Sequence, residues 1–242
     1  MLRAITVYVV VAFFILILGP PLLLWSVISG STDALYTVGI FGAKAALFMA
    51  GVRISVTGRE KIPTGKAVVF MPNHQSNCDP PAVAIILPPV LIMAKKEFFR
   101  VPVLGTSMRM RGSIPVDRTN RERAFDAVDQ AVEALKSGHS FLAFPEGTRS
   151  KTGRLQTFKK GVFVMAIKAG APIIPISVSG TRKIMRKGDY KIYPGPVRIT
   201  IHDAVPTAGC DISDRAKIAG QVRQAIMAGL SAEEQPIEPN TD

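Results

Sequence analysis

Several residue types are scarce in this chain of 242 residues, and their scarcity argues against whole classes of site. The two cysteines, Cys78 and Cys210, lie far apart and match no metal-binding or redox spacing, so we expect free thiols, as in a reducing compartment. The three histidines, His74, His139 and His202, are scattered along the chain. A zinc site needs clustered ligands, so we predict no metal site.

Three common catalytic signatures are also missing. Without a Gly-x-Ser-x-Gly elbow, the serine acyl-enzyme chemistry of an α/β-hydrolase is not indicated. The sequence has no Gly-x-Gly-x-x-Gly fingerprint, and Gly65-Lys66-Ala67 lacks the glycine spacing and the hydroxyl of a P-loop. What remains is chemistry by a base that needs no protein nucleophile.

Acidic residues are few compared with basic ones. There are 18 Asp and Glu against 30 Lys and Arg, which gives a net charge of +12. This excess favours an anionic partner, which composition alone leaves open among nucleic acid, anionic lipid headgroups and phosphorylated substrates. The apolar share of 48 % exceeds that of an average soluble domain.

Charge is absent from residues 4–28, a run long enough to cross about 30 Å of hydrocarbon. Gly19-Pro20-Pro21 interrupts the run, and prolines kink or break a helix. A second apolar run covers residues 35–52. We therefore predict a membrane-anchoring segment over residues 1–52, formed by one kinked helix or by a helical hairpin. A signal peptide is the third alternative, but no small-x-small cleavage site is evident near residues 29–31.

Strand and helix patterns alternate through the next part of the chain. Strands are expected at residues 52–58, 66–71, 90–94, 113–116, 140–144, 173–178 and 197–201, with the last at a sheet edge. Helices are expected at residues 80–87, 119–136, 158–169 and 211–230. This alternation predicts an α/β domain over residues 53–230, with a mixed, mostly parallel sheet flanked by helices. The polar residues 231–242 are predicted to be a disordered tail.

The stretch at residues 72–80 holds the side chains best suited to chemistry. Histidine readily accepts a proton near neutral pH, and the Asp79 carboxylate can orient the His74 ring. Residues five apart lie on different faces of one helix, so we place His74 in a loop. Asp79 then falls at the N-cap of a helix that starts at Pro80. The alternative is that Asp79 is only a cap and His74 an ordinary loop residue.

Four stretches, in this order, resemble the motifs of the glycerolipid acyltransferases. They are His-x-x-x-x-Asp at residues 74–79, Gly-Ser-Ile-Pro-Val-Asp-Arg at 112–118, Phe-Pro-Glu-Gly-Thr-Arg-Ser at 144–150 and Ala-Pro-Ile-Ile-Pro-Ile at 171–176. The third is the most specific. The second departs from the family pattern at Pro115, where an aromatic residue is common. The resemblance covers residues 53–205 and is to the 1-acylglycerol-3-phosphate acyltransferases.

The resemblance implies an activity and its participants. A fatty acyl group would pass from an acyl-CoA or acyl carrier protein thioester to the 2-hydroxyl of 1-acylglycerol 3-phosphate (lysophosphatidic acid), forming phosphatidic acid. The thioester is a co-substrate, and no further cofactor is expected. His74 would be the general base, and Asp79 would hold its tautomer. General base catalysis is worth about 100- to 10,000-fold.

The resemblance also assigns substrate-binding residues. The acceptor phosphate and glycerol fall to Arg118, Glu146, Gly147, Thr148 and Arg149, and a guanidinium suits phosphate because it offers two parallel donors. Either arginine could instead pair with a nearby acid, Asp117 or Glu146 respectively. The acyl donor falls to Pro172, Ile173, Ile174 and Pro175, a stretch that equally fits a core strand.

The expected surroundings follow from the apolar start and the positive charge. We expect a bilayer with anionic headgroups as partner, no nucleic acid, and a place at the cell membrane with the catalytic domain on the cytoplasmic face. Two alternatives remain, an acyltransferase for another lysolipid and a catalytically inactive, basic, membrane-anchored lipid-binding module. The intact pair of His74 and Asp79 favours an enzyme.

Overall fold

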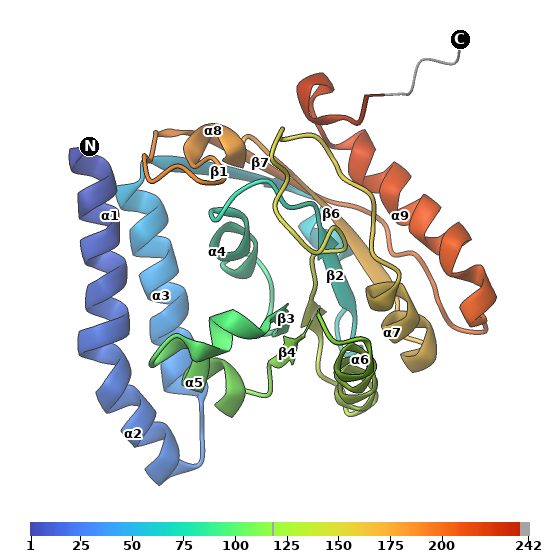
Figure 1. Cartoon of the computed structure of the whole chain (residues 1–242), viewed down its shortest axis with the longest axis horizontal. Coiled ribbons are helices and arrows are strands. Elements are labelled where there is room, and N and C mark those ends of the chain that lie inside the picture. The colour runs from blue at the N-terminus through green and yellow to red at the C-terminus, as the bar shows by residue number, and fades with distance from the viewer. Residues whose placement is uncertain (118, 238–242) are drawn as a thin grey trace.

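The structure is a computed structural model that describes residues 1–117 and 119–237. Its centre is a sheet of seven described strands in the order β1-β7-β6-β2-β5-β3-β4 (Figure 1). The strands are β1 Val52–Thr57, β2 Val69–Pro72, β3 Leu91–Lys95, β4 Ile114–Val116, β5 Phe141–Leu142, β6 Ile173–Ser179 and β7 Gly195–Ile201. Every neighbouring pair runs parallel except β6 and β7. The predicted mixed, mostly parallel sheet is confirmed.

One strand lies elsewhere than predicted. We expected β7 at an edge of the sheet, but it lies between β6 and β1, with Val52 beside Gly195. Its alternating pattern, with Val197, Ile199 and Ile201 buried, reports one solvent-facing side of the sheet. That pattern does not reveal whether another strand pairs with the free backbone edge of β7. In the structure, β1 pairs with that edge.

Helices cover both faces of the sheet. They are α1 Leu2–Ala12, α2 Gly19–Ser29, α3 Asp33–Met49, α4 Asp79–Ala84, α5 Leu104–Met110, α6 Arg121–Lys136, α7 Gly161–Ala169, α8 Thr181–Ile184 and α9 Arg215–Ala228. The helices α6, α7 and α9 pack on one face, and α1, α3, α4 and α8 contribute to the core on the other (Figure 1). Side chains of β2 alternate between the two cores, Val69 and Met71 facing one and Phe70 the other. Burial on both faces explains the continuous apolar sequence of this strand.

The N-terminal apolar runs form a helical hairpin. The helices α1 and α2 are continuous through a π-helical turn, Phe13–Leu18, and α3 returns beside them (Figure 1). The π turn lies just before the two prolines, which have no N–H to continue the regular helical hydrogen bonding. Gly42 of α3 leaves room for Phe14, because a Cβ there would lie 2.8 Å from the Phe14 ring. The structure thus adopts the hairpin alternative rather than a single helix.

The start of the predicted tail is ordered instead of disordered. A 3-10 turn, Ala232–Glu234, packs on the domain, and the Glu234 carboxylate is buried. That carboxylate accepts hydrogen bonds from Ser179 Oγ at 2.6 Å and from the Gly180 N–H at 2.8 Å. These hydrogen bonds stabilise the buried Glu234 carboxylate, whereas the acidic residues of this segment had led us to predict that it is solvated. Residues 238–242 lie outside the described residues.

Candidate active site

Four adjacent parallel strands, β2, β5, β3 and β4, end at one edge of the sheet. His74 follows β2, Glu146 follows β5, and Asp117 follows β4. The carboxyl edge of an open α/β sheet is the usual place for a ligand, because the loops there converge. Three of the four stretches singled out in the sequence therefore lie on this edge.

His74 and Asp79 form a hydrogen-bonded pair in the loop after β2. His74 Nδ1 lies 2.8 Å from Asp79 Oδ2, and the Asp79 side chain is fully buried while 16 % of the His74 side chain is exposed. The imidazole stacks on the ring of Phe144, with centroids 4.2 Å apart. An ionised carboxylate only accepts hydrogen bonds, so Nδ1 carries the hydrogen and Nε2 keeps its lone pair. That lone pair can accept a proton from a bound hydroxyl.

Asp79 is not the helix cap that we predicted. It is the first residue of α4, and the N-cap position belongs to Cys78, whose carbonyl accepts the Ala82 N–H at 3.1 Å. As a cap, Asp79 would accept the Ala82 N–H, but the Cys78 carbonyl already takes that donor. The Asp79 carboxylate instead turns back into the loop.

The rest of the loop fixes the direction of the histidine. Asp79 Oδ2 also accepts the backbone N–H of Gln75 at 2.6 Å and that of Ser76 at 2.7 Å. Asn73 extends the sheet pairing beyond β2, because its side chain both donates to Val178 O and accepts from Val178 N. The backbone carrying His74 is thereby tied to β6.

Glu146 supports the same loop from the neighbouring strand. Its Oε1 accepts the His74 backbone N–H at 2.6 Å, and its Oε2 accepts both the backbone N–H and the side-chain amide of Gln156, at 3.0 and 2.9 Å. Burial raises the pKa of Glu146, and these hydrogen bonds oppose the rise. The alternative pairing of Arg149 with Glu146 is not formed. The role of Glu146 in binding the acceptor stays a prediction.

The remainder of the third stretch forms an open turn. Gly147 has a φ of 70°, a left-handed conformation that favours glycine. Thr148 is exposed and Arg149 half-buried, and the turn is held by Lys187, whose Nζ donates to Arg149 O at 2.8 Å and to Thr148 Oγ1 at 3.3 Å. Among the described residues, the Arg149 guanidinium has no hydrogen-bonding or charged partner, so it is available to an anion.

Arg118 lies outside the described residues. Asp117, the acid with which Arg118 could pair, bonds Lys96 Nζ at 2.7 Å and the Thr119 hydroxyl at 2.6 Å. These hydrogen bonds, that of Lys96 first, hold the pKa of Asp117 well below its usual range. Asp117 is therefore already paired without Arg118.

The fourth stretch lies in the core. Ile173, Ile174 and Pro175 are buried in β6, and Ile173 lies beside Val69, at the start of β2 and away from His74. This matches the core-strand alternative. The assignment of Pro172 and the three residues after it to the acyl donor stays a prediction.

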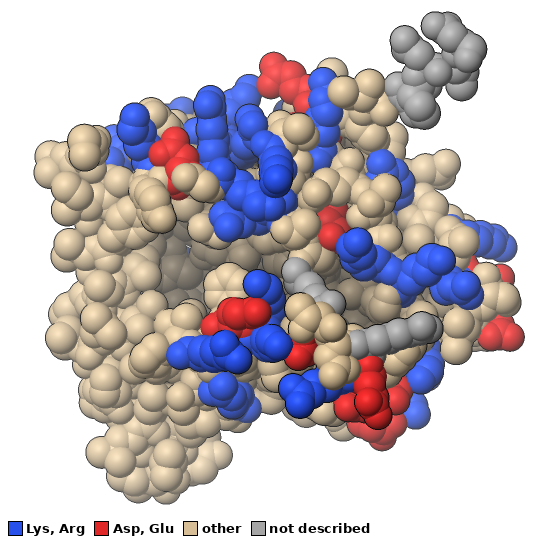
Figure 2. Space-filling model, in the orientation of Figure 1, with Lys and Arg blue, Asp and Glu red and all other residues tan. Residues whose placement is uncertain are grey.

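Positive charge surrounds the carboxyl edge on the face shown in Figure 2. Lys and Arg side chains gather over α8 and the loop that follows it, and again near α5, with a hollow between them. Residues 181–191, which form α8 and the loop after it, contain five basic side chains: Arg182, Lys183, Arg186, Lys187 and Lys191. An anionic ligand fits such surroundings.

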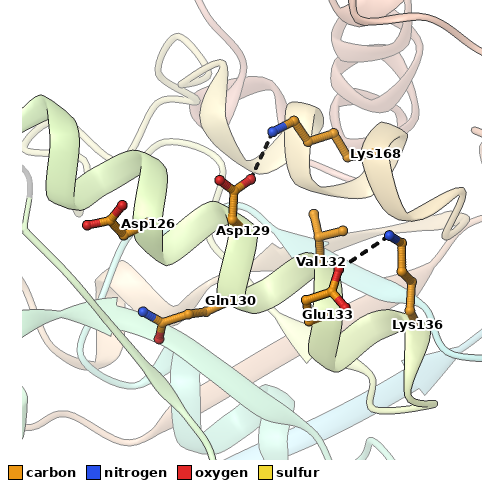
Figure 3. A pocket seen from close by; sticks show the side chains of 7 residues that line it. All are labelled: Asp126, Asp129, Gln130, Val132, Glu133, Lys136 and Lys168. Atoms are coloured by element: carbon orange, nitrogen blue, oxygen red, sulfur yellow. Dashed lines mark hydrogen bonds and ion pairs between the residues drawn. The ribbon is translucent and has the colours of Figure 1, made fainter.

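A separate surface groove lies between α6 and α7 (Figure 3). Two of its three carboxylates are already paired, Asp129 with Lys168 at 2.8 Å and Glu133 with Lys136 at 3.3 Å. None of its lining residues belongs to the four stretches, so we do not place the chemistry there.

Cys78, next to the histidine loop, is not a ready nucleophile, because burial raises the pKa of its thiol to about 12.

Sequence reasoning missed several residues that the structure brings to this site. Phe144 was quoted without a role, and Asn73, Gln156 and Lys187 were not singled out. Phe144, Asn73 and Lys187 act through contacts that span many residues, as between Asn73 and Val178, and Gln156 bonds Glu146 from ten residues away. No local pattern in the sequence marks such contacts.

A histidine–aspartate pair at the carboxyl edge of an α/β sheet fits a class of enzymes that use a single general base. The model of the Acyltransferase family matches residues 53–179, and the chain belongs to this family. The family predicted from the four stretches is therefore confirmed.

Three relatives show how far the similarity extends. A chloroplastic 1-acyl-sn-glycerol-3-phosphate acyltransferase from Arabidopsis thaliana is 37 % identical over 69 % of this chain and 48 % of its own length. A 1-acyl-sn-glycerol-3-phosphate acyltransferase from Borreliella burgdorferi is 30 % identical over 77 % of this chain and 75 % of its own. The crystal structure of the 1-acyl-sn-glycerophosphate (LPA) acyltransferase PlsC from Thermotoga maritima has a TM-score of 0.82 at 28 % identity, covering 94 % of this chain and 93 % of that one. The chain spans about half the length of the chloroplastic relatives from Arabidopsis thaliana and Brassica napus and of the relative from Chlamydomonas reinhardtii.

Proposed function

We propose that the protein transfers a fatty acyl group from a thioester, acyl-CoA or acyl carrier protein, to the 2-hydroxyl of 1-acylglycerol 3-phosphate. The observation that carries this proposal is the pair of His74 and buried Asp79, which leaves Nε2 of His74 as a base. The printed names of the relatives support the same acceptor.

In the proposed reaction the acceptor is itself the nucleophile. Nε2 of His74 takes the hydroxyl proton while the oxygen attacks the thioester carbonyl, forming the new C–O bond. Collapse of the tetrahedral intermediate breaks the C–S bond, and the imidazolium returns its proton to the leaving sulfur. The Asp79 carboxylate stabilises the imidazolium and holds Nδ1 protonated, as the carboxylate does in a catalytic triad.

The acceptor phosphate is assigned to Arg149 and, by its place in the second stretch, to Arg118. A phosphomonoester carries close to two negative charges and three acceptor oxygens, which suits guanidinium groups. The unpartnered guanidinium of Arg149 supports this assignment. Glu146 would act on the acceptor indirectly, by fixing the loop of His74.

The hairpin is assigned to the membrane. The continuous helix from Leu2 to Ser29 is apolar enough and long enough to cross a bilayer, and the large apolar side chains of Leu16, Trp25 and Phe48 are exposed. We place the protein at the cell membrane, with the acyltransferase domain on the cytoplasmic face. Its basic surface would attract anionic headgroups.

The test is a panel of acceptors and donors given to the purified protein. We expect acyl transfer to lysophosphatidic acid in preference to lysophosphatidylcholine or lysophosphatidylethanolamine, with one or both thioester donors. Equal use of the choline-capped acceptor would overturn the phosphate assignment. If no acyl group is transferred from either donor to any acceptor, the proposed enzymatic activity is refuted and a lipid-binding module is favoured.

A further inference from the structure

Gln156 contacts Glu146, the acid that supports the loop of His74. It lies in the segment between the turn at residues 147–149 and α7, and both of its nitrogens reach Glu146 Oε2, the backbone N at 3.0 Å and Nε2 at 2.9 Å. Nε2 also donates to Thr148 O at 2.8 Å. The Gln156 side chain thus links the Glu146 carboxylate to the turn at residues 147–149.

Gln156 is itself held by a residue of α9. Arg223 of α9 donates from Nη1 to Gln156 O at 2.7 Å, and its guanidinium lies over the Phe158 ring, 5.6 Å from the centroid. The contacts form a chain from α9 through Gln156 and Glu146 to the backbone of His74.

We propose that Gln156 is a positioning residue for His74, because its amide keeps the Glu146 carboxylate charged and correctly placed under the catalytic loop. The proposal rests on the proposed function for its effect on turnover. Its effect on the charge state of Glu146 follows from geometry alone.

The charge on Glu146 makes the role of Gln156 dependent on pH. Glu146 is 2 % exposed, and burial raises its pKa above the usual 4.5. His74 is the titratable group of the described residues whose charge acts on Glu146, and Asp79 adjoins that histidine. Since the folded pKa exceeds the unfolded one, ionised Glu146 lowers stability as pH rises through the folded pKa. The Gln156 amide offsets part of that loss, because it donates to the charged form.

The matched variants are Gln156→Leu and Gln130→Leu. The first removes the amide from beside Glu146, and the second removes an exposed amide on α6, labelled in Figure 3. Gln156→Glu is a third variant, which places a second carboxylate next to Glu146 and raises its pKa further by repulsion. Each is compared with wild type by denaturant unfolding at pH 5 and pH 8, and by the pH dependence of kcat.

We expect Gln156→Leu to lose more unfolding free energy, relative to wild type, at pH 8 than at pH 5. Its kcat should fall roughly tenfold, the low end for losing a hydrogen bond to a charged group, while KM for the acceptor stays within about threefold. The acid limb of the kcat profile should move to higher pH, and further in Gln156→Glu. Gln130→Leu should match wild type throughout.

Two results would overturn the proposal. One is an equal loss of stability at both pH values for Gln156→Leu, which indicates lost packing alone. The other is an unchanged acid limb in both Gln156 variants. A wild type without activity toward lysophosphatidic acid would instead refute the proposed function, and the unfolding measurements would still test the link between Gln156 and Glu146.

Discussion

Replacing Asp79 with alanine would remove the acceptor of three hydrogen bonds at one oxygen. Oδ2 serves the backbone N–H groups of Gln75 and Ser76 and the Nδ1–H of His74. In Asp79→Ala both backbone donors stay in a buried loop without a partner. A buried donor left unsatisfied costs about 1–3 kcal/mol, so the two together cost about 2–6 kcal/mol. Loss of a helix cap, the role expected from the sequence, would cost only about 0.5–2 kcal/mol.

Asp79→Asn separates the structural effect from the catalytic one. The amide oxygen can replace Oδ2, since the loop N–H groups hold an acceptor there. The NH2 group then falls where Oδ1 lies, buried and without a hydrogen bond from the described residues. The fold should therefore survive better than in Asp79→Ala. In a protease triad, the same change costs about 10,000-fold because the histidine takes the wrong tautomer.

Here the loop amides should keep the tautomer, so that only the charge facing the imidazolium is lost. A hydrogen bond to a charged group is worth about 1.5–3 kcal/mol, which predicts a fall in kcat of roughly 10- to 100-fold. Both variants are measured by denaturant unfolding in detergent and by steady-state kinetics with lysophosphatidic acid. Equal destabilisation by the two changes would refute the assignment of the loop donors. A 10,000-fold loss in a stable Asp79→Asn protein would refute the argument about the tautomer.

Three further predictions follow from the proposed function. His74→Ala should abolish transfer with little change in melting temperature, and near-normal turnover would end the single-base mechanism. Deleting residues 1–30 should release the protein from membranes or make it aggregate, and carbonate should not extract the full-length chain; extraction as a soluble protein would refute the anchor. Arg118→Ala and Arg149→Ala should each raise KM for lysophosphatidic acid more than for the acyl donor, with partial rescue by lysine, which restores charge without the paired donors. If KM for lysophosphatidic acid is unchanged in both variants, the assignment of the two arginines to the phosphate site is refuted.

Local patterns predicted most of the fold. The apolar run around β2 indicated a strand buried on both faces, and Asn120 caps α6 by accepting the Arg123 N–H at 3.1 Å, as expected for its residue type. One error is local, the helix cap that we expected at Asp79 and that lies at Cys78. The other errors concern contacts between residues far apart in the sequence. The place of β7 depends on β1, which precedes it by more than a hundred residues in the sequence. Neither strand alone shows where the sheet ends.

The site divides in the same way. His74 and Asp79 were found because they are close in the sequence and match a known spacing. The bond from the His74 N–H to Glu146 joins residues 72 apart, and the order of the last turn depends on Ser179, 55 residues before Glu234. Whether a carboxylate is solvated, paired or buried is decided by such contacts, and a single sequence does not display them.

The short separation between His74 and Asp79 has a consequence for how the base is made. The pair closes a loop of five residues, whose entropic cost is small and does not depend on the rest of the domain. The aim of the base is a different matter, because it depends on Glu146 and Val178, which lie 72 and 105 residues away from the residues they hold. Changes elsewhere in the domain should therefore alter where the base points while leaving the base itself formed. A variant could lose activity with its acid–base pair intact, and the same pair could be directed at different acceptors by loops of different design.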